Sequence, residues 1–329
     1  MNSRLTRRSV MLGALAVPFI TRVPPVRAET ASTAFSLPIG LPDHVPGDSF
    51  VVRHGYACEN TWYNPGWLHT GEDWYTISDD SAGALIYAVA DGEVVFAGSE
   101  YPGHVVIVRH AADLYSMYGH LAYELAVETG EPVKQGQRLG TVLARSDGRA
   151  PSHLHFEIRT FLTTPEVNGN SPRYAYGCGF ECPPGPGYWP VNAPEHPSSM
   201  GWRNPTHVIG RQTFPDDKAA VSREVIVADG AAVSAALWSA PEGEDDARPV
   251  GDLRLRAGDH YDLLALDAGR EATTETSAEG YRLWYRIALP GGERAWVQAA
   301  VPSTAETGSD GRPSSVRFDF LPAFAVPQA

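Results

Sequence analysis

Residues 153–159 (HLHFEIR) alternate polar and apolar side chains without a break, and this run constrains the fold more than any other. Alternation has the two-residue period of a β-strand, so the run predicts a half-buried strand with one polar face. The segment from Val51 onward contains further short apolar runs but no long 3.6-residue period. The 27 Pro and 32 Gly residues favour short strands and many turns. We therefore predict an all-β protein.

Two turn motifs predict β-hairpins. Asp91-Gly92 separates an apolar run at 84–89 from another at 93–97, which is typical of a tight hairpin turn. In the C-terminal half, a Pro-Gly-Gly turn joins residues 283–287 to residues 295–297. We expect each pair of runs to form neighbouring antiparallel strands.

Residues 1–28 have the features of a signal peptide. They contain five arginines and no acidic residue, an apolar run at Val10–Ile20, and a small-residue cleavage site at residues 26–28. The Arg7-Arg8 pair resembles a twin-arginine signal, which exports folded proteins, and ordinary secretion is the alternative. The apolar run is too short to span a bilayer and no later run approaches 18 residues, so we expect an extracytoplasmic protein without a membrane span.

The charge balance limits the classes of partner. The chain has 26 Lys and Arg residues against 39 Asp and Glu residues, which gives a net charge of −13. Without residues 1–28 the balance is 21 against 39, or about −18. Nucleic-acid and anionic-membrane binders need clustered positive charge, so this balance argues against both.

Composition also indicates how the chain is divided. We predict a signal peptide at 1–28, a linker at 29–50, a first β domain at 51–210 with an insertion at 161–205, a linker at 211–222, a second β domain at 223–302 and a tail at 303–329. The insertion is rich in Pro, Gly and aromatic residues, so it is either a structural loop with its own small core or a wall of a substrate groove. Cys58, Cys178 and Cys182 leave one thiol over, and both their pairing and the oligomeric state stay open.

Four histidines and one aspartate form the main candidate site. His69 and Asp73 lie four residues apart, and His153 and His155 lie two apart on the alternating run. The imidazoles of His153 and His155 therefore face the same side, about 7 Å apart along the strand. Two imidazole nitrogens and one carboxylate oxygen are a common zinc ligand set with one position open for water. His120 lies between these motifs in the sequence and completes the set.

The order and spacing of these motifs resemble the lysostaphin/LytM-type zinc metallopeptidases, which cut peptide bonds in peptidoglycan. The matching motifs are His69-x-Gly71-x-Asp73, Ala88–Val94, Tyr118-x-His120-Leu121, Val133–Gly140 and His153–Glu157. The resemblance implies an antiparallel-sheet LytM-type fold, similar to a duplicated hybrid motif, with one zinc ion per chain. It implies that His69, Asp73 and His155 bind zinc, and that His120 and His153 handle the water and the developing oxyanion.

Two segments depart from the family pattern. Residues 74–79 and 146–152 differ from the usual small-residue stretches and lie where the resemblance places the groove walls, so they bear on the substrate and not on the metal. His104 is a candidate substrate contact, and His110 is a candidate support for the site. The remaining histidines lie outside the motifs: His44, His54, His196, His207 and His260.

Residues 223–302 resemble a bacterial SH3-like β-barrel, chiefly through the runs at 283–287 and 294–297. The resemblance implies a wall-binding or peptide-binding accessory domain. The alternative is a barrel that only packs against the first domain.

These features together predict an exported zinc metalloendopeptidase that acts on the cross-bridges or stem peptides of peptidoglycan. One alternative is a zinc-containing wall-binding regulator that does not cleave and acts through another hydrolase. The other is a peptidase of secreted proteins or free peptides.

Overall fold

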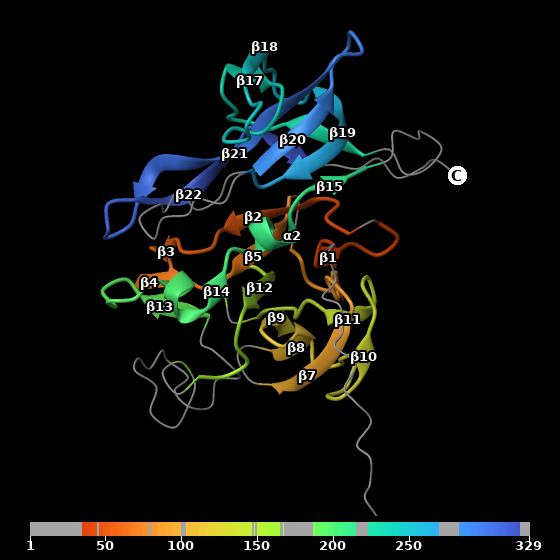
Figure 1. Cartoon of the computed structure of the whole chain (residues 1–329), viewed down its shortest axis with the longest axis vertical. Helices are drawn as coiled ribbons and strands as arrows, with labels where there is room; N and C mark the ends of the chain where they lie inside the picture. The colour runs from red at the N-terminus through yellow and green to blue at the C-terminus, as the bar shows by residue number, and fades with distance from the viewer. Residues whose placement is uncertain are drawn as a thin grey trace, which may run out of the picture. The chain divides into compact units, whose positions relative to one another are not determined.

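The computed structural model describes residues 35–44, 46–77, 80–99, 103–146, 148, 150–164, 167, 187–214, 223–269 and 283–322. Residues 31–329 form one compact unit. The predicted signal peptide, Cys178 and Cys182 lie outside the described residues. The described chain is nearly all β, and its paired strands are antiparallel, which confirms the predicted fold class (Figure 1). In the described residues, no helix combines the length and the apolar character that crossing a bilayer requires.

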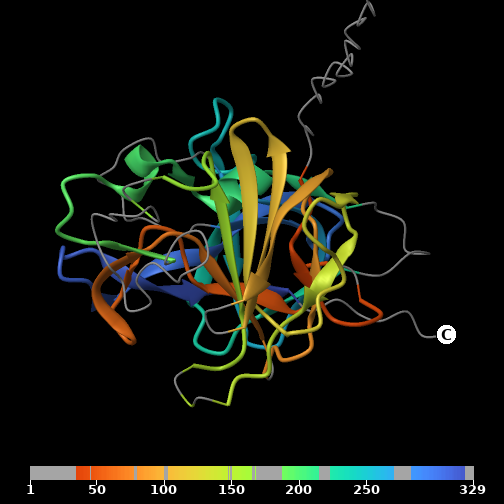
Figure 2. The same ribbon diagram turned by 90° about the horizontal axis from the view of Figure 1, so that it is seen from below.

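The candidate site is built on an eight-stranded sheet with the order β10-β7-β8-β9-β12-β5-β2, in which β14 also pairs with β12. The long strands β7, β8 and β9 lie side by side (Figure 2). The strands span β2 Phe50–His54, β5 Glu72–Thr76, β7 Gly92–Ser99, β8 His104–Ala111, β9 Leu114–Leu121, β10 Pro132–Val133, β12 Leu154–Arg159 and β14 Trp202–Arg203.

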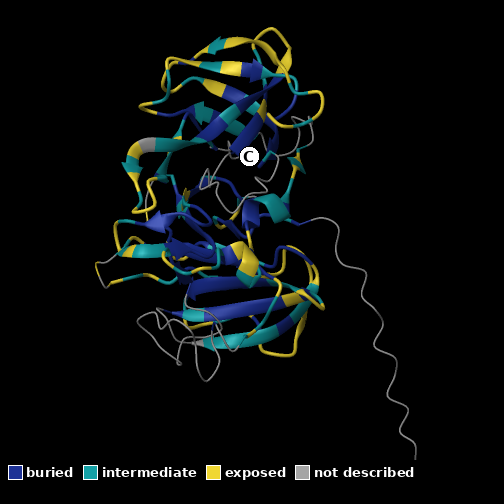
Figure 3. Cartoon of the chain, turned by 60° about the vertical axis from the view of Figure 1, so that its left-hand side comes forward, coloured by how far each residue is buried: buried dark blue, intermediate teal, exposed yellow. Residues whose placement is uncertain are grey.

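Strand β12 carries the alternating run, and both of its faces are buried. Much of the strand ribbon around the middle of the molecule has the dark blue of buried residues in Figure 3. Leu154, Phe156 and Ile158 face the main hydrophobic core. His155 and Glu157 on the opposite face are also buried, as is Arg159. The prediction of a half-buried strand is therefore wrong. Other elements cover both faces of a strand inside the sheet. The alternation of the strand's residues does not show whether its polar face is covered or exposed to solvent.

Two three-stranded sheets flank the central sheet. Their orders are β1-β6-β11 and β13-β4-β3. The strands span β1 Ile39–Gly40, β3 Glu59–Asn60, β4 Asn64–His69, β6 Leu85–Tyr87, β11 Arg138–Thr141 and β13 Tyr188–Pro190. Strand β1 lies in the stretch predicted as a linker, where the side chain of Ile39 is fully buried in the core, so residues 35–50 are largely part of the fold.

The predicted hairpin around Asp91-Gly92 is wrong. Strand β6 pairs with β1 and β11, whereas β7 pairs with β8 and β10, so the turn connects two different sheets. The Asp91 carboxylate accepts hydrogen bonds from Lys134 Nζ at 2.7 Å and from the Gln135 N–H at 2.9 Å. These hydrogen bonds to residues far along the chain fix the turn as a connection between two sheets. The Asp-Gly dipeptide alone does not predict such a connection.

The predicted insertion is in part structural. Its strand β13 pairs with β4, with Tyr188 opposite His69. Trp189 and Trp202 are buried in a small cluster with Tyr56. The described part of the insertion thus has its own small core, as one of the two interpretations expected. Two short helices follow β13, a 3-10 helix at Pro197–Met200 and α2 at Pro205–Ile209.

The C-terminal sheet contains nine strands in the order β18-β17-β21-β20-β19-β16-β23, with β15 paired to β19 and β22 paired to β21. The pairing of β20 with β21 confirms the second predicted hairpin. Strands β22 and β23 lie in the stretch predicted as a tail. The strands span β15 Gln212–Thr213, β16 Glu224–Val227, β17 Ser234–Trp238, β18 Pro249–Arg254, β19 His260–Asp267, β20 Leu283–Ala288, β21 Arg294–Thr307, β22 Pro313–Phe318 and β23 Phe320–Pro322.

Candidate metal centre

The structure brings His69, Asp73 and His155 together from three strands. His69 ends β4, Asp73 lies in β5, and His155 lies opposite Asp73 in β12. The turn between β4 and β5 needs glycine at Gly71, because a Cβ atom there would collide with the Phe156 carbonyl oxygen and lie 2.9 Å from Glu157 Cγ. The motif spacing therefore reflects a close approach of this turn to β12.

Three potential ligand atoms converge in this cluster. His69 Nε2 lies 2.9 Å from His155 Nδ1 and 3.2 Å from Asp73 Oδ1, and His155 Nδ1 lies 3.1 Å from Asp73 Oδ1. Tetrahedral zinc with ligands at about 2.0–2.2 Å places pairs of ligand atoms roughly 3.3 Å apart. The three atoms are therefore spaced as zinc ligands are.

The remaining ring nitrogens of both histidines have acceptors. His69 Nδ1 donates to the Gly55 carbonyl oxygen at 3.3 Å, and His155 Nε2 donates to Glu157 Oε1 at 3.1 Å. These bonds leave the lone pairs of His69 Nε2 and His155 Nδ1 directed at each other and at Asp73. Lone pairs and a carboxylate oxygen at such distances repel each other unless a cation or a proton lies between them. The donor set thus fits a zinc ion.

Burial and mutual contact shift the pKa values of these groups. Burial lowers the pKa of His69 to about 4, although the Asp73 charge opposes this shift. Burial alone would also lower the pKa of His155, but hydrogen bonds to Asp73 and Glu157 raise it to about 9. Burial would raise the pKa of Asp73, but the charges of His69 and His153 hold it well below its usual value. The metal-free cluster therefore keeps an ionised carboxylate and one imidazolium.

His153 presents one defined nitrogen to the cluster. Its Nδ1 donates to the Pro151 carbonyl oxygen at 2.8 Å, so Nε2 carries the lone pair, and Nε2 lies 3.7 Å from Asp73 Oδ1. Burial lowers the pKa of His153. His153 is thus a neutral imidazole whose basic nitrogen faces the candidate ligands.

His120 reaches the site because its backbone is left-handed. Tyr118, two residues earlier in β9, packs against Phe156 in the core, and simple alternation would direct His120 to the same face. His120 instead has a φ of 62°, and its ring lies 4.7 Å from the His153 ring and 6.1 Å from the His155 ring. For a non-glycine residue this conformation costs about 1–3 kcal/mol and occurs mainly at functional sites.

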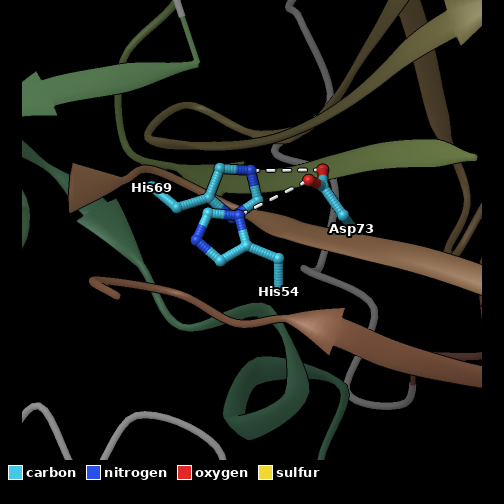
Figure 4. Close-up of side chains that lie close together, drawn as sticks. All are labelled: His54, His69 and Asp73. Carbon is cyan, nitrogen blue, oxygen red and sulfur yellow. Dashed lines mark ion pairs between the residues drawn. The ribbon is translucent and has the colours of Figure 1, made fainter. Parts of the chain in front are cut away.

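The sequence analysis missed His54. Strand β2 places it opposite Asp73, its ring stacks on His69 at 4.2 Å, and its Nδ1 lies 3.6 Å from Asp73 Oδ2 (Figure 4). His54, His69 and Asp73 thus form a second grouping of atoms that could hold a metal. No local signal marks His54, because its position depends on the pairing of β2 with β5.

The sequence analysis also assigned no role to Glu157, although this residue lies in the motif His153–Glu157. Besides His155, it accepts hydrogen bonds from Thr70 Oγ1 at 2.6 Å and Trp202 Nε1 at 3.0 Å, and it pairs with Arg159 at 3.6 Å. Burial alone would raise its pKa, but Arg159 and His155 lower it to about 2. The alternation of β12 could have revealed Glu157, since it shares a face with His155.

The other sequence candidates have separate surroundings. The His104 ring contacts the Tyr123 ring at 5.2 Å. His110 in β8 bonds to the Asp91 carbonyl oxygen, just before β7, and to Ser116 Oγ in β9, each at 2.8 Å. Cys58 is a buried free thiol, and burial together with the Asp310 charge raises its pKa to about 12.

Comparison with known proteins agrees with this geometry. Residues 68–170 match the model of peptidase family M23. Lipoprotein NlpD of Yersinia enterocolitica is 41% identical over 81 residues, which cover 24% of this chain and 80% of that protein. The murein hydrolase activator NlpD of Escherichia coli is 42% identical over 81 residues (24% of this chain, 21% of that protein). The peptidoglycan DD-endopeptidase ShyC of Vibrio cholerae is 37% identical over 91 residues (27% and 20%).

The matched segment spans only about a fifth of the length of Escherichia coli NlpD and of ShyC. Residues 68–170, which the family model matches, include His69, Asp73, His120, His153 and His155, which the structure places in one cluster. The family match and the convergence of these side chains point to the same domain. The chain belongs to peptidase family M23.

Proposed function

We propose that this chain is a zinc-dependent endopeptidase that hydrolyses peptide bonds of peptidoglycan, in the cross-bridge or the stem peptide. The observation that carries the proposal is the convergence of His69 Nε2, Asp73 Oδ1 and His155 Nδ1 within 2.9–3.2 Å. These three residues would hold one zinc ion per chain. Bound zinc would supply Lewis acidity, which lowers the pKa of water to about 7 and polarises a carbonyl group.

His153 would act as the general base. Because the Pro151 carbonyl oxygen holds the Nδ1 proton, Nε2 is the atom that can accept a proton from the attacking water. The same nitrogen would then deliver that proton to the leaving amine. His120 lies beside His153 and would donate a hydrogen bond to the developing oxyanion. Glu157 would hold His155 in the tautomer that presents Nδ1 to the metal.

A non-cleaving regulator of another wall hydrolase is the second candidate. It is favoured by the similarity to NlpD of Escherichia coli, which is named a murein hydrolase activator. The presence of the ligand set together with His120 and His153 favours cleavage instead. In this proposal the chain acts outside the cytoplasm after export by residues 1–28, through the twin-arginine route. An SH3-like domain at 223–302 would bind the wall.

The decisive experiment is digestion of purified peptidoglycan by the zinc-loaded protein, with mass spectrometry of the new termini. Glycine-rich peptides and elastin are digested in parallel to test the alternative substrates. We expect new amino termini from peptidoglycan with the wild type and none with Asp73→Ala, which should also lose zinc. His153→Ala should keep zinc and lose hydrolysis. A fully zinc-loaded wild type that releases no new termini would refute the endopeptidase and leave the regulator.

A further inference from the structure

Tyr75 lies on the metal-site face of β5, in one of the segments that depart from the family pattern. Asp73 and Tyr75 are two residues apart on this strand and so share a face. The Tyr75 ring stacks on the His153 ring, with centroids 4.7 Å apart and planes 25° apart. The side chain of Tyr75 is partly exposed. Tyr75 therefore extends from the proposed general base towards solvent.

Arg53 also contacts the Tyr75 ring. The pairing of β2 with β5 shifts register between Val52 and His54, so Arg53 is the additional residue of a β-bulge. Its guanidinium carbon lies 5.3 Å from the centre of the Tyr75 ring, and its Nη2 donates to the Thr76 carbonyl oxygen at 3.2 Å. Arg53 is exposed, and among the described residues no carboxylate lies within ion-pair distance of it. One bond fixes the guanidinium plane while further N–H donors remain available.

From this arrangement, we propose that Arg53 forms a carboxylate-binding subsite beside Tyr75 and His153, so that the site takes peptides with a free carboxylate near the scissile bond. Guanidinium groups bind carboxylates through paired N–H donors, and Arg53 is already oriented by Tyr75 and Thr76. In a chain of net charge −13, a cation at this edge attracts an acidic peptide that the rest of the surface would repel. This inference rests on the proposed function, because it concerns the substrate of the same site.

The test uses cross-linked muropeptides from purified peptidoglycan and the same muropeptides after their carboxylates are converted to amides. Their affinities are measured by titration calorimetry on zinc-free protein, so binding is read without cleavage. Arg53→Gln is compared with the wild type, with Arg53→Lys as the conservative variant. Arg203→Gln, which removes an exposed arginine of β14, is the matched control. If the endopeptidase proposal is wrong, the protein will not cleave peptidoglycan, but the difference in affinity between native and amidated muropeptides can still be measured.

We expect the wild type to bind the native muropeptides about tenfold more tightly than the amidated ones, the size expected for hydrogen bonds to a charged group. Arg53→Gln should lose most of this preference, Arg53→Lys should keep part of it, and Arg203→Gln should keep all of it. Partially amidated muropeptides, sorted by mass, show whether a terminal or a side-chain carboxylate is recognised. Equal affinity of the wild type for native and amidated muropeptides would overturn the proposal, as would an equal loss in Arg203→Gln.

Discussion

Replacing Glu157 by glutamine tests the electrostatics of the candidate metal centre most directly. The carboxylate is fully buried and accepts bonds from Thr70, His155 and Trp202 while it pairs with Arg159. Glutamine keeps the shape but directs an N–H donor at groups that are themselves donors. It also removes the negative charge that pairs with the buried Arg159 guanidinium.

The expected loss follows from these contacts. Breaking a buried ion pair by removing one partner costs about 3–5 kcal/mol in the free energy of unfolding. Loss of the carboxylate that holds a metal-binding histidine weakens metal affinity by about 10–100-fold. We therefore expect Glu157→Gln to lose about 3–5 kcal/mol of stability in the zinc-free protein and to bind zinc at least tenfold more weakly.

Urea unfolding measures the stability, and competition with a chromophoric chelator measures the zinc affinity. The matched control is Glu93→Gln, because the Glu93 side chain is 46% exposed and pairs with Arg109 at the surface. An exposed pair contributes only about 0–1 kcal/mol, so this variant should resemble the wild type in both assays. If Glu157→Gln stays within 1 kcal/mol of Glu93→Gln and binds zinc within twofold of the wild type, our account of the buried carboxylate is wrong.

Three further changes test other parts of the structure. Gly71→Ala should lower the free energy of unfolding, measured in urea, by about 2 kcal/mol or more, because its Cβ would collide with the β12 backbone. Gly291→Ala is the control and should be neutral, because the space around Gly291 is open. Equal losses in the two variants would contradict the close approach of the turn to β12. Burial lowers the pKa of His110, so its contribution to stability is complete above about pH 6.5 and is lost as the pH falls towards the folded-state pKa. His110→Gln should therefore lose less stability than the wild type between pH 7.5 and 5. His54→Ala should weaken zinc binding about tenfold by removing the ring that stacks on His69, and an unchanged affinity would exclude a supporting role.

Local rules accounted for much of the site. The alternation of residues 153–159 correctly predicted a strand that places His155 and Glu157 on one face, because the two-residue period is a property of the extended backbone itself. The sequence also shows His69 and Asp73 four residues apart around Gly71. The structure adds that Gly71 is needed because β12 lies against the turn.

Other local signals were misleading where distant partners decided the outcome. Asp91-Gly92 is a strong turn signal, yet Lys134 and Gln135 bind Asp91 and the strands on either side of the turn join different sheets. Alternation would place His120 in the core, and only its left-handed backbone directs the ring towards His153. A single dipeptide or period contains no information about these contacts.

The sequence by itself determined the residue types of the site, the shared strand face of His155 and Glu157, and the all-β character of the chain. Only the tertiary structure decided that both faces of β12 are buried, that His54 lies opposite Asp73, and that Arg53 and Tyr75 line the site beside His153. The physical reason is that periodicity and turn chemistry are set by neighbours along the chain. Burial, strand register and electrostatic environment are set by segments that meet only when the whole sheet assembles.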